Sequence, residues 1–304
     1  MEAKKQRKYL VVIAVLTALA VVLSACRSGN SNAEKPDPEA LKALGKIQVI
    51  AREDGSGTRA VFAQMTGLEQ NNSKKDASDA TRTDAEVQDS GEAVLEAAKD
   101  SLSAIGYVSM GLLGDTKDVK ALSVDGIAPE TEQIKSEKYP LSRTFYLAYS
   151  GELSDLEQDF LSYVNGAGQQ IVSENFVAVV KKPADSFLSG KQSGIIRISG
   201  STSVAPLLQQ LAKEYEKYNP NAKIEIEETD STQGLTAAME GRCDLAMSSR
   251  DLKDYDAELL QSKAIAKDGI LILVSQENPL QNITMDQLAK IYRGDVSQWS
   301  DLAD

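Results

Sequence analysis

The feature that most constrains the fold is a glycine-hinged turn that joins an apolar strand to a helix. The strand is expected at residues 47–50, and the turn follows at residues 51–59 with the sequence Ala-Arg-Glu-Asp-Gly-Ser-Gly-Thr-Arg. Gly55 and Gly57 allow backbone angles that bring amide N–H groups together and let a ligand approach the main chain. A helix beginning at Thr58 adds unpaired N–H groups and the positive end of its dipole. This stretch is therefore predicted to bind an anion.

The polar residues of this turn suit a tetrahedral oxyanion. Ser56 and Thr58 supply hydroxyl donors, and Arg52 supplies a planar guanidinium that pairs well with oxyanions. Residues 196–206, Ile-Arg-Ile-Ser-Gly-Ser-Thr-Ser-Val-Ala-Pro, repeat the same arrangement. We therefore expect one anion to be held between the two turns.

The remaining pattern is that of an α/β protein, in which short apolar strands alternate with helices. In the first part of the chain, strands are expected at 104–108, 119–124, 144–149 and 176–180, and helices at 90–102 and 156–164. After a linker at residues 181–194, strands are expected at 195–198, 223–227 and 244–247, each followed by a hydroxyl-rich turn. A capping box at residues 284–287 opens a last helix that ends at Gly294. Because ligands of open α/β sheets lie at the carboxyl ends of strands, the hydroxyl-rich turns are expected to gather at one site.

Composition excludes several classes of function. The chain has 304 residues, with 33 Lys and Arg against 45 Asp and Glu and a net charge of −12, which argues against a nucleic-acid partner. It has no histidine, the commonest metal ligand and general base, so neither a metal nor a cofactor is expected. Cys243 is expected to be a small buried apolar residue. An anion site in this acidic chain must work through local dipoles and hydrogen bonds.

The N-terminus has the pattern of a targeting segment. An apolar run at residues 9–23 is preceded by the basic residues Lys4, Lys5, Arg7 and Lys8. The following Leu-Ser-Ala-Cys resembles the lipobox of bacterial lipoproteins, which implies cleavage before Cys26 and attachment of diacylglycerol to its thiol. Residues 1–25 are then a signal peptide and residues 26–46 a tether. The alternative is an uncleaved membrane anchor, and either interpretation places the body outside the cytoplasm.

Several segments together resemble a known family. They are Arg-Glu-Asp-Gly-Ser-Gly-Thr-Arg at 52–59, Gly-Ser-Thr-Ser-Val-Ala-Pro-Leu at 200–207, Asp-Ser-Thr-Gln-Gly at 230–234 and Met-Ser-Ser-Arg at 247–250. Weaker support comes from residues 104–109 and 138–143. The chain from residue 47 onward is similar to the phosphate-binding lipoproteins of bacterial ABC phosphate importers, which have the type II periplasmic-binding-protein fold.

This resemblance implies two α/β lobes, each a mixed sheet flanked by helices, with the ligand cleft between them. It implies a monomer, lipid-anchored at the outer face of the cytoplasmic membrane, that captures inorganic phosphate by lobe closure and delivers it to ABC permease subunits. Phosphate would be bound by Arg52, Ser56, Gly57 and Thr58 of one lobe and by Thr202, Ser203, Ser231 and Ser249 of the other. For any single hydroxyl, the competing interpretation is an ordinary helix N-cap.

The position of Ser249 departs from the family pattern. Many relatives have an aspartate there, which accepts a proton from phosphate and repels fully ionised sulfate. Glu53, Asp54 and Asp230 remain candidates for that role, and the sequence alone does not choose among them.

The order of the segments also departs from the family, whose members begin with the Gly-Ser-Thr-Ser segment and reach the Arg-Glu-Asp-Gly-Ser-Gly-Thr segment later. A circular permutation explains this order, with residues 181–194 joining the family's usual ends. One lobe would then comprise residues 47–180 with a return of the chain at 264–304, and the other would comprise residues 195–263. The rival explanation is a truncated tandem fusion that carries half of each of two copies.

Other classes of function remain to be weighed. A phosphoryl-transfer enzyme would need a base or a metal, and the glycine-rich turn lacks the lysine of a P-loop. A surface sensor or adhesion protein could use the same fold. Both alternatives are ranked below capture of phosphate for an importer.

Overall fold

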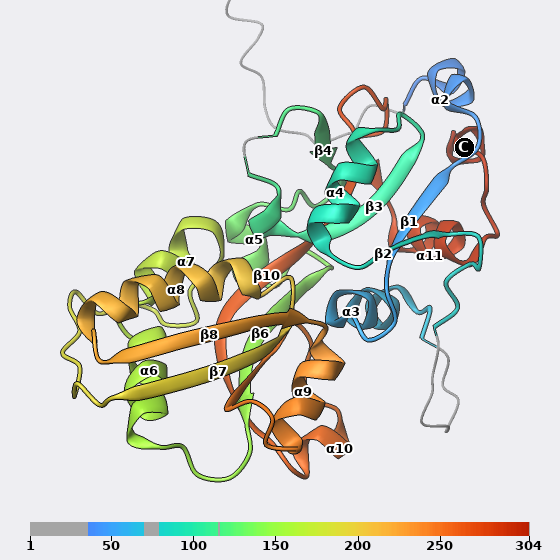
Figure 1. Ribbon diagram of the computed structural model, residues 1–304. Helices are drawn as coiled ribbons and strands as arrows, with labels where there is room; N and C mark the ends of the chain where they lie inside the picture. The colour runs from blue at the N-terminus through green and yellow to red at the C-terminus, as the bar shows by residue number, and fades with distance from the viewer. Residues whose placement is uncertain (1–35, 70–78, 115, 304) are drawn as a thin grey trace, which may run out of the picture. The chain divides into compact units, whose positions relative to one another are not determined.

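The computed structural model describes residues 36–69, 79–114 and 116–303 (Figure 1). The expected signal peptide and Cys26 lie outside the described residues, as do residues 26–35 of the expected tether. Residues 35–304 form one compact unit, and its main sheet has the strand order β2-β1-β3-β10-β6-β9-β7-β8, with β4 also paired to β10. The expectation of an α/β fold is confirmed.

One lobe, here called lobe A, comprises the described residues of 36–141 and 270–303. Its strands are β1 (Gln48–Arg52), β2 (Glu86–Gln88), β3 (Ala104–Ser109), β4 (Val119–Ala121), β5 (Ser123–Val124), β11 (Asn282–Ile283) and the last part of β10 (Gln261–Ser275). Its helices are α2 (Pro38–Leu44), α3 (Gly57–Thr66), α4 (Gly91–Lys99), α5 (Thr131–Lys135) and α11 (Met285–Arg293), with short 3-10 turns η1 (Met110–Leu112) and η2 (Trp299–Leu302).

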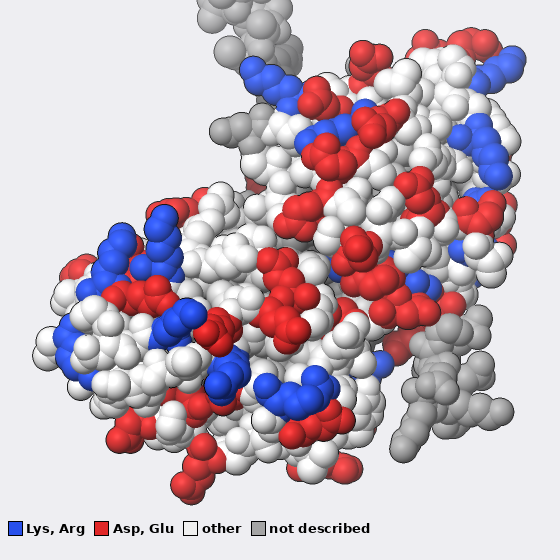
Figure 2. All heavy atoms as spheres, viewed as in Figure 1, with Lys and Arg blue, Asp and Glu red and all other residues white. Residues whose placement is uncertain are grey.

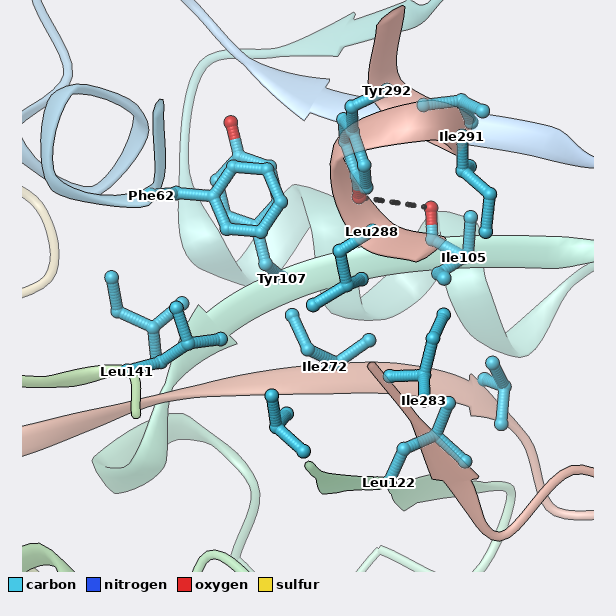
Figure 3. Packing of buried hydrophobic residues seen from close by; sticks show 14 of the residues in the cluster. Phe62, Ile105, Tyr107, Leu122, Leu141, Ile272, Ile283, Leu288, Ile291 and Tyr292 are labelled. Carbon is cyan, nitrogen blue, oxygen red and sulfur yellow. Dashed lines mark hydrogen bonds between the residues drawn. The ribbon is translucent and has the colours of Figure 1, made fainter. Parts of the chain in front are cut away.

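The core of lobe A is built around three aromatic rings that meet between α3, β3 and α11 (Figure 3). Phe62 stacks on Tyr107 with ring centroids 4.3 Å apart, and Tyr292 meets Phe62 edge-on at 4.7 Å. The hydroxyl of Tyr292 donates to the carbonyl oxygen of Ile50 at 3.1 Å, so this buried polar group is satisfied. The packing fixes α3 against β1, and thereby fixes the turn between them.

The other lobe, here called lobe B, comprises residues 142–269. Its strands are β6 (Ser142–Tyr149), β7 (Gly194–Ser201), β8 (Ala222–Thr229), β9 (Leu245–Ser248) and the first part of β10. Its helices are α6 (Asp155–Val164), α7 (Gln169–Asn175), α8 (Ala205–Tyr218), α9 (Ser231–Met239) and α10 (Asp254–Ala257). Its cores lie on the two faces of the sheet, one against α6 and α8 and the other against α9.

Strand β10 belongs to both lobes, as Figure 1 shows. Gly269 pairs with Ser142 of β6, whereas the next residue, Ile270, pairs with Ser109 of β3. The chain therefore crosses between the lobes at residues 141–142 and 269–270. Two adjacent crossings of this kind form a hinge about which two lobes can close.

The structure corrects the expected lobe boundaries. Residues 142–180 were expected with lobe A, but β6 pairs with β9 and β10, and Phe145 and Leu147 are buried in the core of lobe B. An apolar strand pattern indicates burial but does not indicate which sheet the strand joins, so the sequence could not place β6. The boundary is at residue 141.

Two smaller expectations are also corrected. Residues 38–44 of the expected tether instead form α2, a helix whose Leu41 is fully buried in the core of lobe A. Residues 176–180 are not a strand, and only Val177 forms a bridge, to Lys267. The long strand β10 was not anticipated. The linker before β7, the capping box of Thr284 and Gln287, and the left-handed Gly294 that ends α11 are as expected.

Candidate functional site

The lobe A half of the site is the turn between β1 and α3, and it has the predicted strand-turn-helix form. Gly55 has a φ of +90°, which favours glycine, and the Oγ of Ser56 accepts the N–H of Arg59 at 3.3 Å as the N-cap of α3. The helix begins one residue earlier than expected, at Gly57. The first N–H groups of α3, which have no partner within the helix, therefore begin at Gly57.

Gly57 is required by the close approach of lobe B. A Cβ atom at Gly57 would lie 2.4 Å from the Oγ of Ser231 and 2.5 Å from the Oγ of Ser249. These distances are shorter than real Cβ contacts, so only glycine fits here while the lobes are together. Gly57 is thus placed where the backbone of α3 meets the hydroxyls of the opposite lobe.

The lobe B half of the site lies at the carboxyl ends of the parallel strands β7, β8 and β9, as the hydroxyl-rich turns predicted. Ser201 donates to the Oγ of Ser249 at 3.0 Å, and the N–H of Ser249 donates to the Oγ of Ser231 at 3.2 Å. Ser231 and Ser249 are fully buried. Ser231 is the first residue of α9, so its hydroxyl lies at the positive end of that helix.

The two halves contact each other directly. The Nη2 of Arg52 donates to the Oγ1 of Thr202 at 3.0 Å, and the hydroxyls of Thr58 and Ser203 are 2.9 Å apart. The backbone N–H of Thr232 also donates to the carbonyl oxygen of Gly55, at 3.3 Å. Gly57 also lies against Ser231 and Ser249. These contacts bring seven of the eight predicted ligand residues together at the interface between lobes A and B, here called the seam. The eighth, Ser56, lies at the same turn but uses its oxygen to cap α3.

The charges of the seam are balanced locally. Arg52 is buried, and its Nε and Nη2 each donate to a carboxylate oxygen of Glu53 at 2.7 Å. Asp268 likewise pairs with Arg143, which lies at the start of β6. Each buried cation therefore has its own carboxylate, as expected for a site that works through dipoles and hydrogen bonds in an acidic chain.

Arg143 is a site residue that the sequence reasoning missed. Its Nη1 donates to the Oγ1 of Thr58 at 2.7 Å and to the carbonyl oxygen of Ser249 at 3.3 Å, so it touches both lobes. Burial lowers its pKa, although the charge of Asp268 acts in the opposite sense. The sequence held one signal, because Arg143 ends the segment 138–143 that supported the family resemblance.

The three candidate proton acceptors are separated by the structure. Asp54 points away from the seam, since its side chain is 86% exposed and pairs with Arg59 at 2.9 Å, so it is removed from the candidates. Asp230 caps α9, and its carboxylate accepts the N–H of Gln233 at 2.8 Å and the Nε2 of the same residue. Glu53 lies beside Arg52 at the seam. Strand β1 ends at Arg52 and the chain turns at Asp54 and Gly55, so Glu53 and Asp54 have different partners.

The seam opens into a cleft of about 410 Å³ that has an acidic rim. The cleft is lined by Glu53, Asp89, Ser90, Thr202, Glu228, Thr229, Asp230 and Gln233. Acidic side chains are also numerous over the face drawn in Figure 2, in line with the net charge of −12. Such a rim disfavours multiply charged anions and favours less ionised ones.

Within the described residues, no group of carboxylates and cysteines could hold a metal ion. Cys243 is buried, and burial raises the pKa of its thiol to about 11, which fits the expected apolar role. The described helices include none that is long and apolar enough to span a membrane.

Comparison with known proteins decides the family. A family model described as a PBP superfamily domain matches residues 7–167 and 186–304. The phosphate-binding protein PstS 2 of Streptococcus pneumoniae serotype 4 is 38% identical over 291 residues, which cover 94% of this chain and 97% of that protein. The chain belongs to the PstS family of the PBP superfamily. The present chain is also 32% identical to PstS 2 of Streptococcus agalactiae serotype V, over 98% of this chain and 99% of that protein.

A solved structure agrees with this placement in the PstS family. The crystal structure of a phosphate ABC transporter, phosphate-binding protein from S. pneumoniae TIGR4 superposes with a TM-score of 0.71 at 36% identity, covering 85% of this chain and all of that one. The family consists of binding proteins, so the enzyme alternative is set aside. Four further PstS proteins match over only 34% to 49% of this chain.

Proposed function

We propose that this chain captures inorganic phosphate between its lobes and presents it to an ABC importer. The observation that carries the proposal is the seam, where donors from both lobes lie within hydrogen-bond distance of one another. Arg52 supplies a charge, the N-terminal turn of α3 supplies N–H groups, and Ser231 and Ser249 supply hydroxyls. Membership of the PstS family, whose members named above are phosphate-binding proteins, supports phosphate as the anion.

Capture proceeds without chemistry. Phosphate enters the open cleft, and the donors of lobe A and lobe B replace its hydration shell as the hinge closes. Because the ligand contacts both lobes, it stabilises the closed state over the open one, and the permease recognises the closed state. We propose that Glu53, which lies beside Arg52, accepts the proton of a phosphate and repels sulfate, in place of the aspartate that many relatives have at the position of Ser249.

The cellular location is part of the same proposal. The lipobox pattern at Cys26 supports cleavage and lipid attachment, which would hold a monomer at the outer face of the cytoplasmic membrane. Residues between Cys26 and α2 would then form the tether. The permuted order is supported by the carboxyl-terminal half of the chain, which matches the segments with which family members usually begin. The four PstS proteins that match over only 34% to 49% of this chain fit the same proposal, because an unpermuted relative aligns with a permuted chain over one block of sequence only.

Isothermal titration tests the proposal directly. The chain from Arg27 onward contains the whole compact unit, and unfolding followed by dialysis removes any carried-over anion before refolding. One-to-one binding of phosphate with a much weaker response to sulfate is expected near neutral pH. A folded sample that binds neither anion would contradict the proposal and favour an adhesion role.

A further inference from the structure

We propose that Arg143 is a positioning residue for anion capture, which fixes the hydroxyl of Thr58 as a hydrogen-bond donor and links it through Asp268 to the hinge. This inference rests on the proposed function, because it concerns how the same seam holds its anion. It assigns a role to a residue that is not among the eight predicted phosphate ligands.

The first step is the direction of the hydrogen bonds. A guanidinium has donors and no acceptor, so the Oγ1 of Thr58 must accept the proton of Arg143 Nη1 across their 2.7 Å contact. Arg143 engages one lone pair of the Thr58 hydroxyl, and Ser203 Oγ lies 2.9 Å away on the seam side. We infer that Thr58 directs its proton to that side, where an anion would accept it. A charged donor also polarises the hydroxyl and makes it a stronger donor. An ionised phosphate oxygen needs such a donor.

The second step is the position of Arg143 at the hinge. Arg143 and Asp268 are opposite residues of β6 and β10, one residue from each crossing between the lobes. The Nε of Arg143 donates to Oδ2 of Asp268 at 2.7 Å. Oδ1 of Asp268 accepts from the Oγ of Ser109 at 2.8 Å and from the N–H of Met110 at 3.1 Å, both at the end of β3 in lobe A. The guanidinium is therefore held where the lobes pivot.

The third step joins the two. Thr58 belongs to lobe A and Arg143 to lobe B, so their hydrogen bond forms only when α3 has moved against lobe B. The carbonyl oxygen of Ser249, 3.3 Å from the same Nη1, holds the guanidinium on the lobe B side. Closure thus brings Thr58 to a fixed, charged partner and completes the donor set at the same moment.

The chain offers a matched control. Arg250 is also buried in lobe B, pairs with Asp256 through Nη1 at 2.7 Å, and like Arg143 has an Nη2 without a partner among the described residues. The only other hydrogen bond found for its guanidinium among the described residues goes to the carbonyl oxygen of Asp251, so the side chain donates to none of the predicted ligand hydroxyls. A purely structural role for buried arginine–aspartate pairs would make the two arginines equivalent in anion binding.

The experiment compares Arg143→Lys with Arg250→Lys in the chain from Arg27 onward, using phosphate titration and thermal unfolding. Lysine is a point charge that can keep Asp268 paired but cannot also reach Thr58. Arg143→Lys should weaken phosphate binding about tenfold to a hundredfold, whereas Arg250→Lys should leave it within about twofold. In a Thr58→Val background, Arg143→Lys should have little further effect, because the hydroxyl it acts through is gone.

Unchanged phosphate affinity in Arg143→Lys, or a loss of equal size in the Thr58→Val background, would overturn the inference. If Arg143→Lys does not fold, the double variant Arg143→Gln with Asp268→Asn removes both charges together and leaves no unpaired buried charge. That variant should bind phosphate at least tenfold more weakly, and affinity equal to the unaltered chain would overturn the inference. Failure of the unaltered chain to bind phosphate would instead overturn the proposed function, and this inference with it.

Discussion

Replacing Gly57 with alanine should abolish tight phosphate binding while leaving the fold intact. The added Cβ would lie 2.4 Å from Ser231 Oγ, about 1 Å closer than an ordinary contact, and both Ser231 and Ser249 are buried and cannot swing away. The seam must therefore open by about 1 Å. That displacement lengthens the Arg52–Thr202 and Thr58–Ser203 hydrogen bonds, now 3.0 and 2.9 Å, beyond hydrogen-bond range.

The expected loss follows from these contacts. Two neutral or singly charged hydrogen bonds between the lobes contribute about 1 kcal/mol each, and contacts of one lobe to a charged ligand contribute about 1.5–3 kcal/mol. Their loss amounts to roughly 3–5 kcal/mol, which is about a hundredfold to several thousandfold in Kd. The free energy of unfolding, measured without phosphate, should rise instead, because alanine in a helix is more favourable than glycine by up to about 1 kcal/mol.

Titration with phosphate and thermal unfolding without it measure the two effects separately. Gly91→Ala is the matched control, because Gly91 is also the first residue of a lobe A helix and its added Cβ would meet the movable side chain of Leu112 rather than lobe B. Gly57→Ala with a Kd within about threefold of the unaltered chain would refute the argument that the seam closes as described. So would a large fall in melting temperature, since it would place the damage in the fold.

Two further predictions concern the site, and a third concerns the buried thiol of Cys243. Ser56→Ala should lower the free energy of unfolding by about 1 kcal/mol, because the N-cap of α3 is lost, and it should also weaken phosphate binding. Thermal unfolding and phosphate titration measure these two effects, and an unchanged melting temperature would contradict the capping role. Glu53→Gln should narrow the preference for phosphate over sulfate by roughly tenfold, because a charge that repels sulfate is removed, and an unchanged ratio of the two Kd values would exclude Glu53 as the discriminating group. Cys243 should react with a thiol reagent at pH 8 only after unfolding in urea, because its raised pKa keeps the buried thiol protonated; rapid reaction of the folded chain would show an exposed thiol.

Much of the site could be predicted because it depends on local sequence. The turn from Arg52 to Thr58 needs glycine for its backbone, a capping serine at Ser56 and a helix start, and each of these has a local signature. The hydroxyls of Ser231 and Ser249 follow strands whose carboxyl ends must lie at one edge of a sheet. Local sequence signals are therefore enough to predict that these groups lie near one another.

The rest depends on pairings that are distant in the sequence. Arg143 and Asp268 are 125 residues apart, and no periodicity links an arginine at the start of one strand to an aspartate in another. For the same reason the sequence analysis assigned β6 to the wrong lobe, because the buried face of this strand would fit the sheet of either lobe. The pairing of Asp54 was also beyond the sequence, since its partner Arg59 lies on α3 and comes beside it only once that helix is folded.

The permuted order that we propose is compatible with closure because it leaves the hinge untouched. Residues 297–299 lie beside residues 45–47, with the N–H of Ile47 donating to the carbonyl oxygen of Ser297 at 2.9 Å and the N–H of Trp299 donating to that of Gly45 at 3.0 Å. In a chain of the usual family order these segments would be consecutive, and here they remain neighbours within lobe A. Both crossings between the lobes, at 141–142 and 269–270, are distant from this point and from the linker before β7. Opening the chain there would remove no contact of the seam and no strand pairing of the hinge, so the proposed closure on an anion is compatible with either order of the chain.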